Sequence, residues 1–203
     1  MEYRFYGNEN ANVSAVNEKY RKIADPRMLY DMLSGIWCAE TCAPRMRDRW
    51  TAENMTLGQC SITAFLTQDI FGGKVYGILR PNGNYHCYNV IGDCVFDLTS
   101  EQFGDEKLSY EGNTEQFRDV HFAKEEKRLR YEYLKNELEK LISEEYMVLK
   151  IYEDDYGCEG IPEDGELMCS VLARNAGGEE KWLKIADKWL TDNEVTVGSV
   201  IRR

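Results

Sequence analysis

The sequence lacks a long hydrophobic run and is short of positive charge. No segment of its 203 residues approaches the ~18 consecutive apolar residues of a membrane-spanning helix, so we expect no membrane partner. Lys and Arg number 25 against 36 Asp and Glu, which gives a formal net charge of −11. Nucleic-acid binding requires basic side chains that displace counterions from phosphates. The acidic balance therefore argues against nucleic acids and anionic membranes as partners.

Signals for export, cofactors and metals are missing as well. Residues 1–5 do not have the basic, then hydrophobic, then small-residue order of a secretory signal. Seven cysteines, an odd number, are scattered along the chain, and we expect them to be reduced thiols in the cytoplasm. No phosphate-cradling glycine loop or dinucleotide fingerprint predicts a cofactor. Metal ligation is not predicted either, because the cysteines form no pair of short-spaced zinc motifs.

Helical patterns precede strand patterns in the first half of the chain. Asp25-Pro26 has the order of an N-cap and a first helical residue, and a helix is predicted after it. Thr56–Gln59 has the spacing of a capping box, and the helix that follows should stop at Gly72-Gly73. The Asn-Gly pair in Pro81–Asn84 favours a tight hairpin. The pattern predicts antiparallel strands over Lys74–Leu79, Tyr85–Val90 and Cys94–Leu98.

The remaining segments complete an α+β organisation. Residues 1–13 show no period and are predicted to form a poorly ordered arm, and residues 38–56 to form a long ordered loop that crosses the site. A strong amphipathic helix is expected over about Lys124–Ser143. After it the period changes to that of strands. We therefore predict an α+β domain over residues 1–145 and a separate small antiparallel β module over 146–203.

Three chemically capable residues follow one another on the central elements. Cys60 stands where the apolar-periodic helix begins, His86 lies in the strand Tyr85–Asn89, and Asp97 lies in the next predicted strand. Cysteine, histidine and aspartate in this order outline a thiol-nucleophile site.

Cys60 could be converted from a thiol to a thiolate in two ways, by the start of its helix and by a neighbouring base. The unperturbed pKa of a cysteine is about 8.5, and the unpaired N–H groups of a helix start favour negative charge. His86 could take the thiol proton and return it to the leaving group. Asp97 could hold the imidazole in the right tautomer. Strand alternation places His86 and Tyr88 on one face.

Further residues complete the predicted site. The backbone N–H of Cys60 would supply one oxyanion donor, with Gln59 or a group in the 38–56 loop as the second. Trp50 or Trp37 could wall the cleft and exclude water. Asn89, close behind His86, is a further candidate for substrate binding.

Each residue also has a purely structural interpretation. Cys60 could be a small core residue, His86 a satisfied core or turn residue, and Asp97 the cap of a short helix at residues 100–103. The ordered combination favours a site over these separate interpretations. The second histidine, His121, has no chemical partners nearby in sequence, and we expect it at the surface.

The motifs resemble a known family. Gly58-Gln59-Cys60, Gly72-Gly73, His86-x-x-Asn89 and the stretch from Phe96 to Phe103 are similar to the YunG-like family of bacterial proteins, over about residues 27–104. More distantly, the order of cysteine, histidine and aspartate resembles the transglutaminase-like and papain-like cysteine enzymes. That resemblance implies Cys60 as nucleophile, His86 as base, Asp97 as orienting group, and acyl-transfer chemistry on an amide or thioester.

Three functions remain as hypotheses. The first is a cytoplasmic cysteine hydrolase or acyltransferase with a papain/transglutaminase-like α+β domain, acting on a peptide, a protein or a small amide. The second is a non-enzymatic module of the same fold that binds a peptide or protein. The third is a metal-binding domain that uses the thiols.

Overall fold

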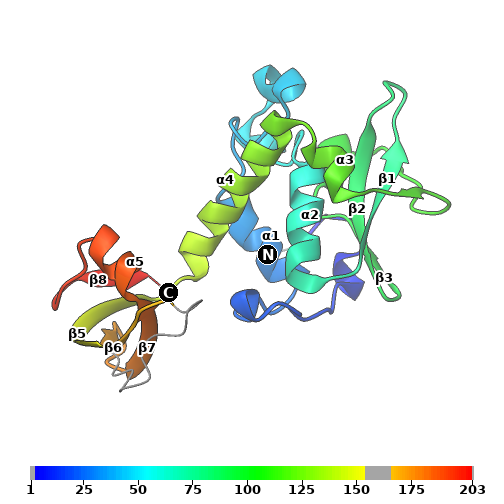
Figure 1. Cartoon of the computed structure of the whole chain (residues 1–203). Coiled ribbons are helices and arrows are strands. Elements are labelled where there is room, and N and C mark those ends of the chain that lie inside the picture. The colour runs from blue at the N-terminus through cyan, green and yellow to red at the C-terminus, as the bar shows by residue number, and fades with distance from the viewer. Residues whose placement is uncertain (1–2, 154–165, 203) are drawn as a thin grey trace. The chain divides into compact units, whose positions relative to one another are not determined.

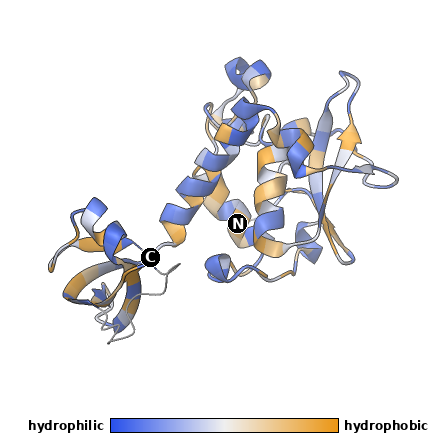
Figure 2. Ribbon diagram, viewed as in Figure 1, coloured by the Kyte–Doolittle hydropathy of each residue, from blue (hydrophilic) through white to orange (hydrophobic). Residues whose placement is uncertain are grey.

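Helix α2 (Cys60–Phe71) is the centre of the larger of two compact units. In the computed structural model, which describes residues 3–153 and 166–202, α2 contacts α4 (Glu125–Ile142) and strand β2 (Tyr85–Ile91), and it lies between them (Figure 1). Three quarters of the α2 side chains are buried as a result, and Figure 2 shows the helix mostly in hydrophobic and neutral colours. The start of α2 is thereby fixed against the sheet.

The sheet beside α2 is antiparallel, with the strand order β3-β2-β1-β4. Its strands are β1 (Lys74–Leu79), β2, β3 (Cys94–Phe96) and β4 (Thr114–Glu115). Gly83, at φ +75°, makes the tight turn that pairs β1 with β2 in the register Ile78 to His86. The three predicted strands are confirmed, and the two-residue β4 was not predicted.

The predicted helices are present, but one of their caps is different. Asp25 caps α1 (Pro26–Ser34) by accepting hydrogen bonds from two backbone N–H groups, and α2 ends at Gly72 as predicted. The capping box at Thr56–Gln59 was wrong, because α2 begins at Cys60 without a side-chain cap. The Gln59 side chain instead donates to the Cys38 carbonyl at 3.1 Å, so a contact distant in sequence replaces the local one.

The amino-terminal segment is ordered, which corrects the prediction of a poorly ordered arm. Phe5 is fully buried in the main core, and the Tyr3 hydroxyl donates to Asp31 at 2.7 Å. Tyr6 forms an isolated antiparallel bridge with Asp97. The segment therefore supports the strand end that carries Asp97.

Short elements link these helices and strands. The 38–56 stretch holds two short 3₁₀-helices, η3 (Pro44–Arg49) and η4 (Ala52–Asn54), and the short helix α3 (Arg118–Phe122) leads into α4. Figure 1 shows the light-blue turn η3 beside the green start of α4. The short elements of this unit are η1 (Asn8–Asn10), η2 (Glu18–Tyr20), η3 (Pro44–Arg49), η4 (Ala52–Asn54), η5 (Ser100–Phe103) and α3 (Arg118–Phe122).

The second unit is a small antiparallel sheet with its own core. The chain divides into Met1–Ile142 and Ser143–Arg203, and the sheet of the second unit has the order β7-β6-β5-β8. Its elements are β5 (Glu145–Glu153), β6 (Met168–Asn175), β7 (Glu180–Ala186), α5 (Asp187–Asp192) and β8 (Val200–Arg202). Buried side chains alternate along β6, as one covered sheet face requires. Leu190 of α5 joins this core, and α5 was not predicted.

The fold class is α+β, as the sequence predicts. Helices and two antiparallel four-stranded sheets make up the described chain. Over the ranges 3–153 and 166–202, no helix combines the length and the apolar character needed to cross a bilayer.

Candidate active site

His86 and Asp97 are in direct contact in the interior. His86 Nε2 lies 2.5 Å from Asp97 Oδ2, and both side chains are almost fully buried. β2 and β3 pair next to each other, which brings the first residues of β2 close to the end of β3. A buried charge of this kind is stable only with partners, and each of these residues supplies one for the other.

Asp97 is held by more than the imidazole. Its Oδ1 accepts from the backbone N–H and the hydroxyl of Thr99, at 3.0 and 3.1 Å, and its Oδ2 also accepts from the Tyr110 hydroxyl at 3.0 Å. One oxygen therefore makes a turn at the end of the strand, while the other contacts His86. The alternative in which Asp97 caps the short helix at residues 100–103 does not hold, since Thr99 occupies the cap position of η5.

Cys60 stands at the first position of α2, beside the imidazole. Nε2 of His86 is engaged by Asp97, and its other nitrogen, Nδ1, is buried and makes no well-formed hydrogen bond within the part of the chain that the structure describes. Nδ1 is therefore the nitrogen available to the Cys60 thiol, which interacts with the ring. Cys60 keeps some exposure to solvent. Cys60 also lines a cleft, which connects this partly exposed residue to solvent.

The surroundings of Cys60 and His86 favour a negatively charged thiolate beside a positively charged imidazolium. A hydrogen bond with the Cys87 thiol and the charge and hydrogen bonding of His86 outweigh burial, so the pKa of Cys60 lies well below its usual value. Burial acts to lower the pKa of His86, but Asp97 and Cys60 overcome it and raise the pKa to about 10. Cys87 shows the opposite shift, since the bond to Cys60 and burial raise its pKa. At neutral pH these shifts favour a Cys60 thiolate beside a His86 imidazolium.

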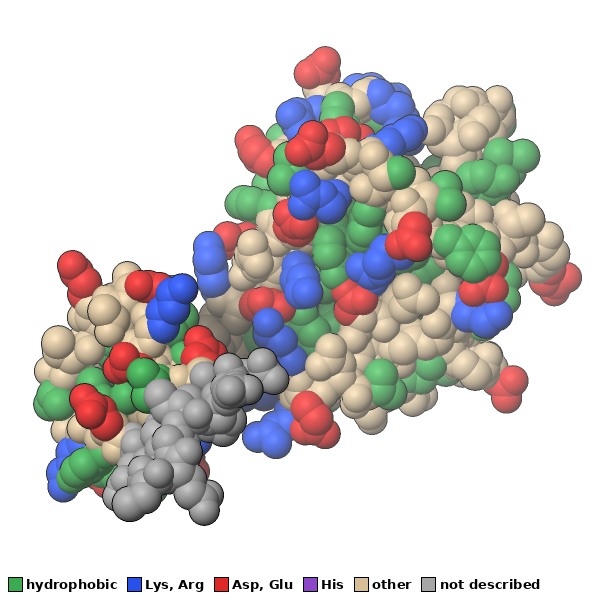
Figure 3. Space-filling model, viewed as in Figure 1, with side chains coloured by type: hydrophobic (Ala, Val, Ile, Leu, Met, Phe, Trp, Pro, Cys, Tyr) green, Lys and Arg blue, Asp and Glu red, His purple; other side chains and the backbone are tan. Residues whose placement is uncertain are grey.

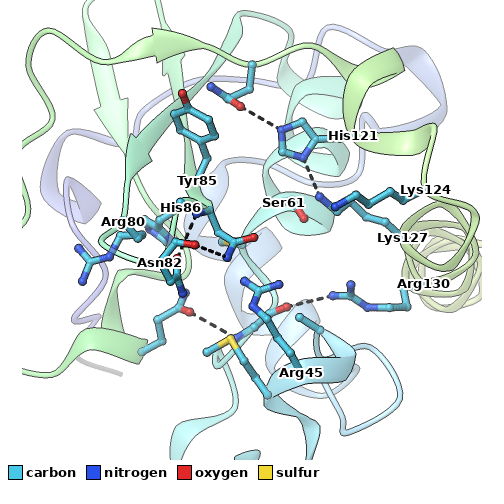
Figure 4. A pocket seen from close by; sticks show the side chains of 18 of the residues that line it. Arg45, Ser61, Arg80, Asn82, Tyr85, His86, His121, Lys124, Lys127 and Arg130 are labelled. Carbon is cyan, nitrogen blue, oxygen red and sulfur yellow. Dashed lines mark hydrogen bonds between the residues drawn. The ribbon is translucent and has the colours of Figure 1, made fainter.

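A cleft of about 510 Å³ opens over Cys60 and His86, a size typical of small-molecule sites. Its walls come from η3, from the β1–β2 turn at residues 80–85, and from α3 and the start of α4 (Figure 4). Phe103 packs edge-on against His86, with ring centroids 4.7 Å apart. The Arg80 guanidinium lies 4.6 Å above the Phe103 ring. These groups cover one side of the imidazole.

His121 belongs to this cleft, and its predicted surface position was wrong. It is buried, its Nδ1 accepts from Lys127 at 3.0 Å, and its Nε2 lies 3.0 Å from Gln116 Oε1 (Figure 4). Burial, followed by the Lys127 charge, lowers the pKa of His121 to about 4. It is therefore neutral at pH 7, with its proton on Nε2, because Lys127 occupies Nδ1.

Arg130 fixes the chain just before Cys60. Its Nε donates to the Thr41 carbonyl at 2.8 Å and its Nη2 to the Gly58 carbonyl at 3.0 Å. Glu126 approaches the same guanidinium at 3.4 Å. Gly58 has a φ of +71°, and a Cβ there would lie 2.7 Å from Cys42 Sγ, so only glycine fits without strain. Arg130 and Gly58 together set the entry of the chain into α2.

The four predicted accessory residues, Gln59, Asn89, Trp50 and Trp37, do not line the cleft. Gln59 is fully buried, and its amide nitrogen is occupied by the Cys38 carbonyl. Asn89 lies on the opposite face of β2 from His86 because of strand alternation, and it donates to the Ala64 carbonyl of α2 at 2.9 Å. Trp50 donates to the Met55 carbonyl at 3.0 Å, away from the cleft. Trp37, the other predicted wall, is buried in the core and donates to Thr63.

Several residues around the site were not predicted, because their roles depend on tertiary contacts. Tyr110 and Tyr6 stack with ring centroids 3.8 Å apart, and Tyr110 reaches Asp97. No local period marked either of them. The cleft-lining Ser61, next to Cys60, could have been noticed as a hydroxyl at a helix start. The cationic cleft residues come from segments that are distant in sequence.

Metal ligation gains no support within the described residues. No group of three or more His, Cys, Asp and Glu side chains there is arranged to hold a metal ion. The six cysteines that the structure describes are free thiols.

Comparison with known proteins places the larger unit in a family. The family model described as "YunG protein" matches residues 25–143, more than half of the chain. The chain belongs to the YunG family. The matched range contains Cys60, His86 and Asp97, so the candidate site lies within the family's part of the chain.

One curated relative is similar over a shorter stretch. It is the "Uncharacterized protein YunG" of Bacillus subtilis (strain 168), 46% identical over 55 residues, which are 27% of this chain and 47% of the relative. The match thus spans about half of the length of that YunG protein. No solved structure matches this chain.

Proposed function

We propose that this YunG-family chain is a cysteine-dependent hydrolase or acyltransferase that acts on an amide or thioester. The observation that carries the proposal is the buried His86–Asp97 contact of 2.5 Å next to a partly buried cysteine at a helix start. The same order of cysteine, histidine and aspartate resembles that of transglutaminase-like and papain-like enzymes. Such a constellation, opening into a cleft, is a reasonable basis for acyl transfer.

The proposed reaction has two steps. The Cys60 thiolate attacks the carbonyl carbon, and the backbone N–H of Cys60 donates to the developing oxyanion. His86 gives its proton to the departing amine or thiolate, which leaves a thioester on Cys60. Water or an amine then attacks the thioester, with His86 accepting a proton and Cys60 leaving as the thiolate. Asp97 keeps the imidazole oriented throughout.

The test uses a thioester of simple structure, phenyl thioacetate, and peptide mass spectrometry. Under the proposal, the peptide that contains Cys60 gains one acetyl group ahead of all others, and His86→Ala slows this acetylation by about a hundredfold. Cys94→Ser serves as the control, because Cys94 is a partly exposed thiol on β3 that does not line the cleft. Equal acetylation of the cysteines would contradict the proposal.

The variant Cys60→Ser tests the alternative that the protein is a non-enzymatic binding module. If Cys60 only packs, Cys60→Ser should reduce the free energy of unfolding without changing the binding of a peptide or protein. If Cys60 is a nucleophile, Cys60→Ser should leave the free energy of unfolding within about 1 kcal/mol of the original while it abolishes acetylation.

A further inference from the structure

We propose that the cleft selects acyl substrates that carry an anionic group, a carboxylate or a phosphate, and that Arg45, Lys124 and Lys127 bind this group. The inference rests on the proposed function and adds its substrate class. It follows from the charges and contacts of the residues around Cys60.

The cleft has the opposite charge balance from the chain as a whole. Its lining includes five Lys or Arg side chains and a single carboxylate, Glu126. The whole sequence has 25 Lys and Arg against 36 Asp and Glu. One fifth of the chain's Lys and Arg residues therefore line this one cleft in an acidic protein. A cleft lined by one sign of charge attracts ligands of the other sign.

Two of the five cations are already neutralised by the protein. Both carboxylate oxygens of Glu106 accept from Arg80 at 2.8 Å. Arg130 is committed to two backbone carbonyls and faces Glu126. These two arginines build the walls, and their charges are not free for a ligand.

The other three cations lack an acidic partner among the described residues. Arg45 on η3 is exposed, Lys124 precedes α4, and no ion pair involving either one is present in the described structure. Figure 4 shows Arg45 and the two lysines extending into the cleft from different walls. Lys and Arg side chains also gather over the upper end of the larger unit in Figure 3, where Figure 1 places η3.

Lys127 is positioned by a neutral group. Its Nζ donates to His121 Nδ1 at 3.0 Å, and His121 is in turn held by Gln116. Burial lowers the pKa of Lys127. An anion in the cleft would offset this effect and favour the charged ammonium. Lys127 is therefore held at the cleft by a neutral imidazole, and no carboxylate among the described residues pairs with its ammonium group.

The test compares two reagents that alkylate a thiolate in the same way. Iodoacetate carries a carboxylate and iodoacetamide is neutral, and with each a carbon–sulfur bond forms as the carbon–iodine bond breaks and iodide leaves. The second-order rate constants for Cys60 are measured with both reagents, and their ratio is compared with that for free cysteine at equal pH and ionic strength. We expect the iodoacetate preference of Cys60 to exceed that of free cysteine by about fivefold or more at low salt.

Variants locate the preference within the cleft. Arg45→Gln/Lys124→Gln should reduce the iodoacetate-to-iodoacetamide ratio by about threefold to tenfold. The matched control Arg49→Gln/Lys135→Gln removes the same charge from η3 and α4 outside the cleft, and it should keep the original ratio. An original ratio equal to that of free cysteine, or an equal fall in both double variants, would overturn the inference.

The outcomes separate this inference from the proposed function. If iodoacetamide modifies Cys60 selectively but iodoacetate shows no preference, the proposed nucleophile stands and the anion selectivity fails. If neither reagent selects Cys60, the proposed function fails, and the inference with it. Protection of Cys60 from iodoacetamide by inorganic phosphate or by succinate, against sodium chloride at equal ionic strength, then distinguishes a phosphate from a carboxylate. Protection by neither would also count against the inference.

Discussion

Asp97 divides its two carboxylate oxygens between structure and chemistry. Oδ1 makes the turn through Thr99, while Oδ2 faces His86 and the Tyr110 hydroxyl. Burial lowers the pKa of His86, and among the groups that raise it the negative charge of Asp97 has a larger effect than any one hydrogen bond. Removing the charge should therefore discharge His86 at neutral pH.

The variant Asp97→Asn tests this at the scale of a single residue. It keeps the size and much of the hydrogen bonding of the side chain but removes its charge, so the pKa of His86 should fall from about 10. With a neutral imidazole the Cys60 thiolate loses its partner, and iodoacetamide labelling at pH 6.5 should slow by about tenfold or more. Tyr110→Phe, which removes one hydrogen bond and no charge, should slow labelling by less than about threefold. Labelling of Asp97→Asn at the original rate would contradict this role.

The entry into α2 is an element whose geometry depends on one glycine. Gly58→Ala would place a methyl group 2.7 Å from Cys42 Sγ and 2.9 Å from the Ala43 backbone nitrogen, in a left-handed conformation. We expect the free energy of unfolding to fall by about 2 kcal/mol or more, measured by urea denaturation, with slower labelling of Cys60. The control is Gly83→Ala, which has a similar φ of +75° but no atom within 4 Å of the added Cβ. Gly83→Ala should reduce the free energy of unfolding by about 1 kcal/mol. Equal losses in the two variants would show that the close contacts at Gly58 are unimportant.

The amino-terminal segment is the second element that supports the site. Phe5 is fully buried, so Phe5→Ala should reduce the free energy of unfolding by about 3–5 kcal/mol in urea denaturation. Val16→Ala is the control, because Val16 is 70% exposed and should change stability by less than about 0.5 kcal/mol. If Phe5→Ala has the stability of the original chain, the segment is not packed in solution.

The elements also show what a sequence can and cannot predict. Asp25, Gly72 and the Asn82-Gly83 turn act through their own neighbours, so the helix bounds and the β1–β2 hairpin were predictable. The burial of Phe5 has no local signal, since its partners lie in α1 and beyond. The capping box failed for a related reason, because the side chain of Gln59 bonds to Cys38.

At the site, the order of residue types along the chain predicted the central residues, whereas closeness in sequence did not predict the residues that line the cleft. Cys60, His86 and Asp97 could be proposed together because Cys60 begins a predictable helix, His86 lies in a predictable strand and Asp97 directly follows β3. Gln59 and Asn89 were chosen as near neighbours of Cys60 and His86. Strand alternation turns Asn89 toward α2, and a hydrogen bond holds the Gln59 side chain at the Cys38 carbonyl, so neither lines the cleft. The basic lining could not be predicted, because its residues are distant in the sequence and only the fold brings them together.

On the scale of the whole molecule, the candidate site belongs to one unit. The cleft is lined by residues between Ala43 and Arg130, all within Met1–Ile142, and each unit has its own hydrophobic core. A fragment of residues 1–142 should therefore fold and label at Cys60 within about threefold of the rate of the full chain. Circular dichroism verifies folding, and mass spectrometry follows labelling. A folded fragment that labels more than about tenfold slower would show that residues 143–203 contribute to the site.

The pH dependence of Cys60 alkylation tests the central claim most directly. Because the pKa of Cys60 lies well below its usual value and that of His86 is raised to about 10, the thiolate–imidazolium pair should persist across neutral pH. We therefore predict a rate constant for iodoacetamide that is nearly constant between about pH 6.5 and 9, where an ordinary thiol of pKa about 8.5 gains reactivity steeply. A rate at Cys60 that rises about tenfold per pH unit up to pH 8, as for a free thiol, would contradict the account.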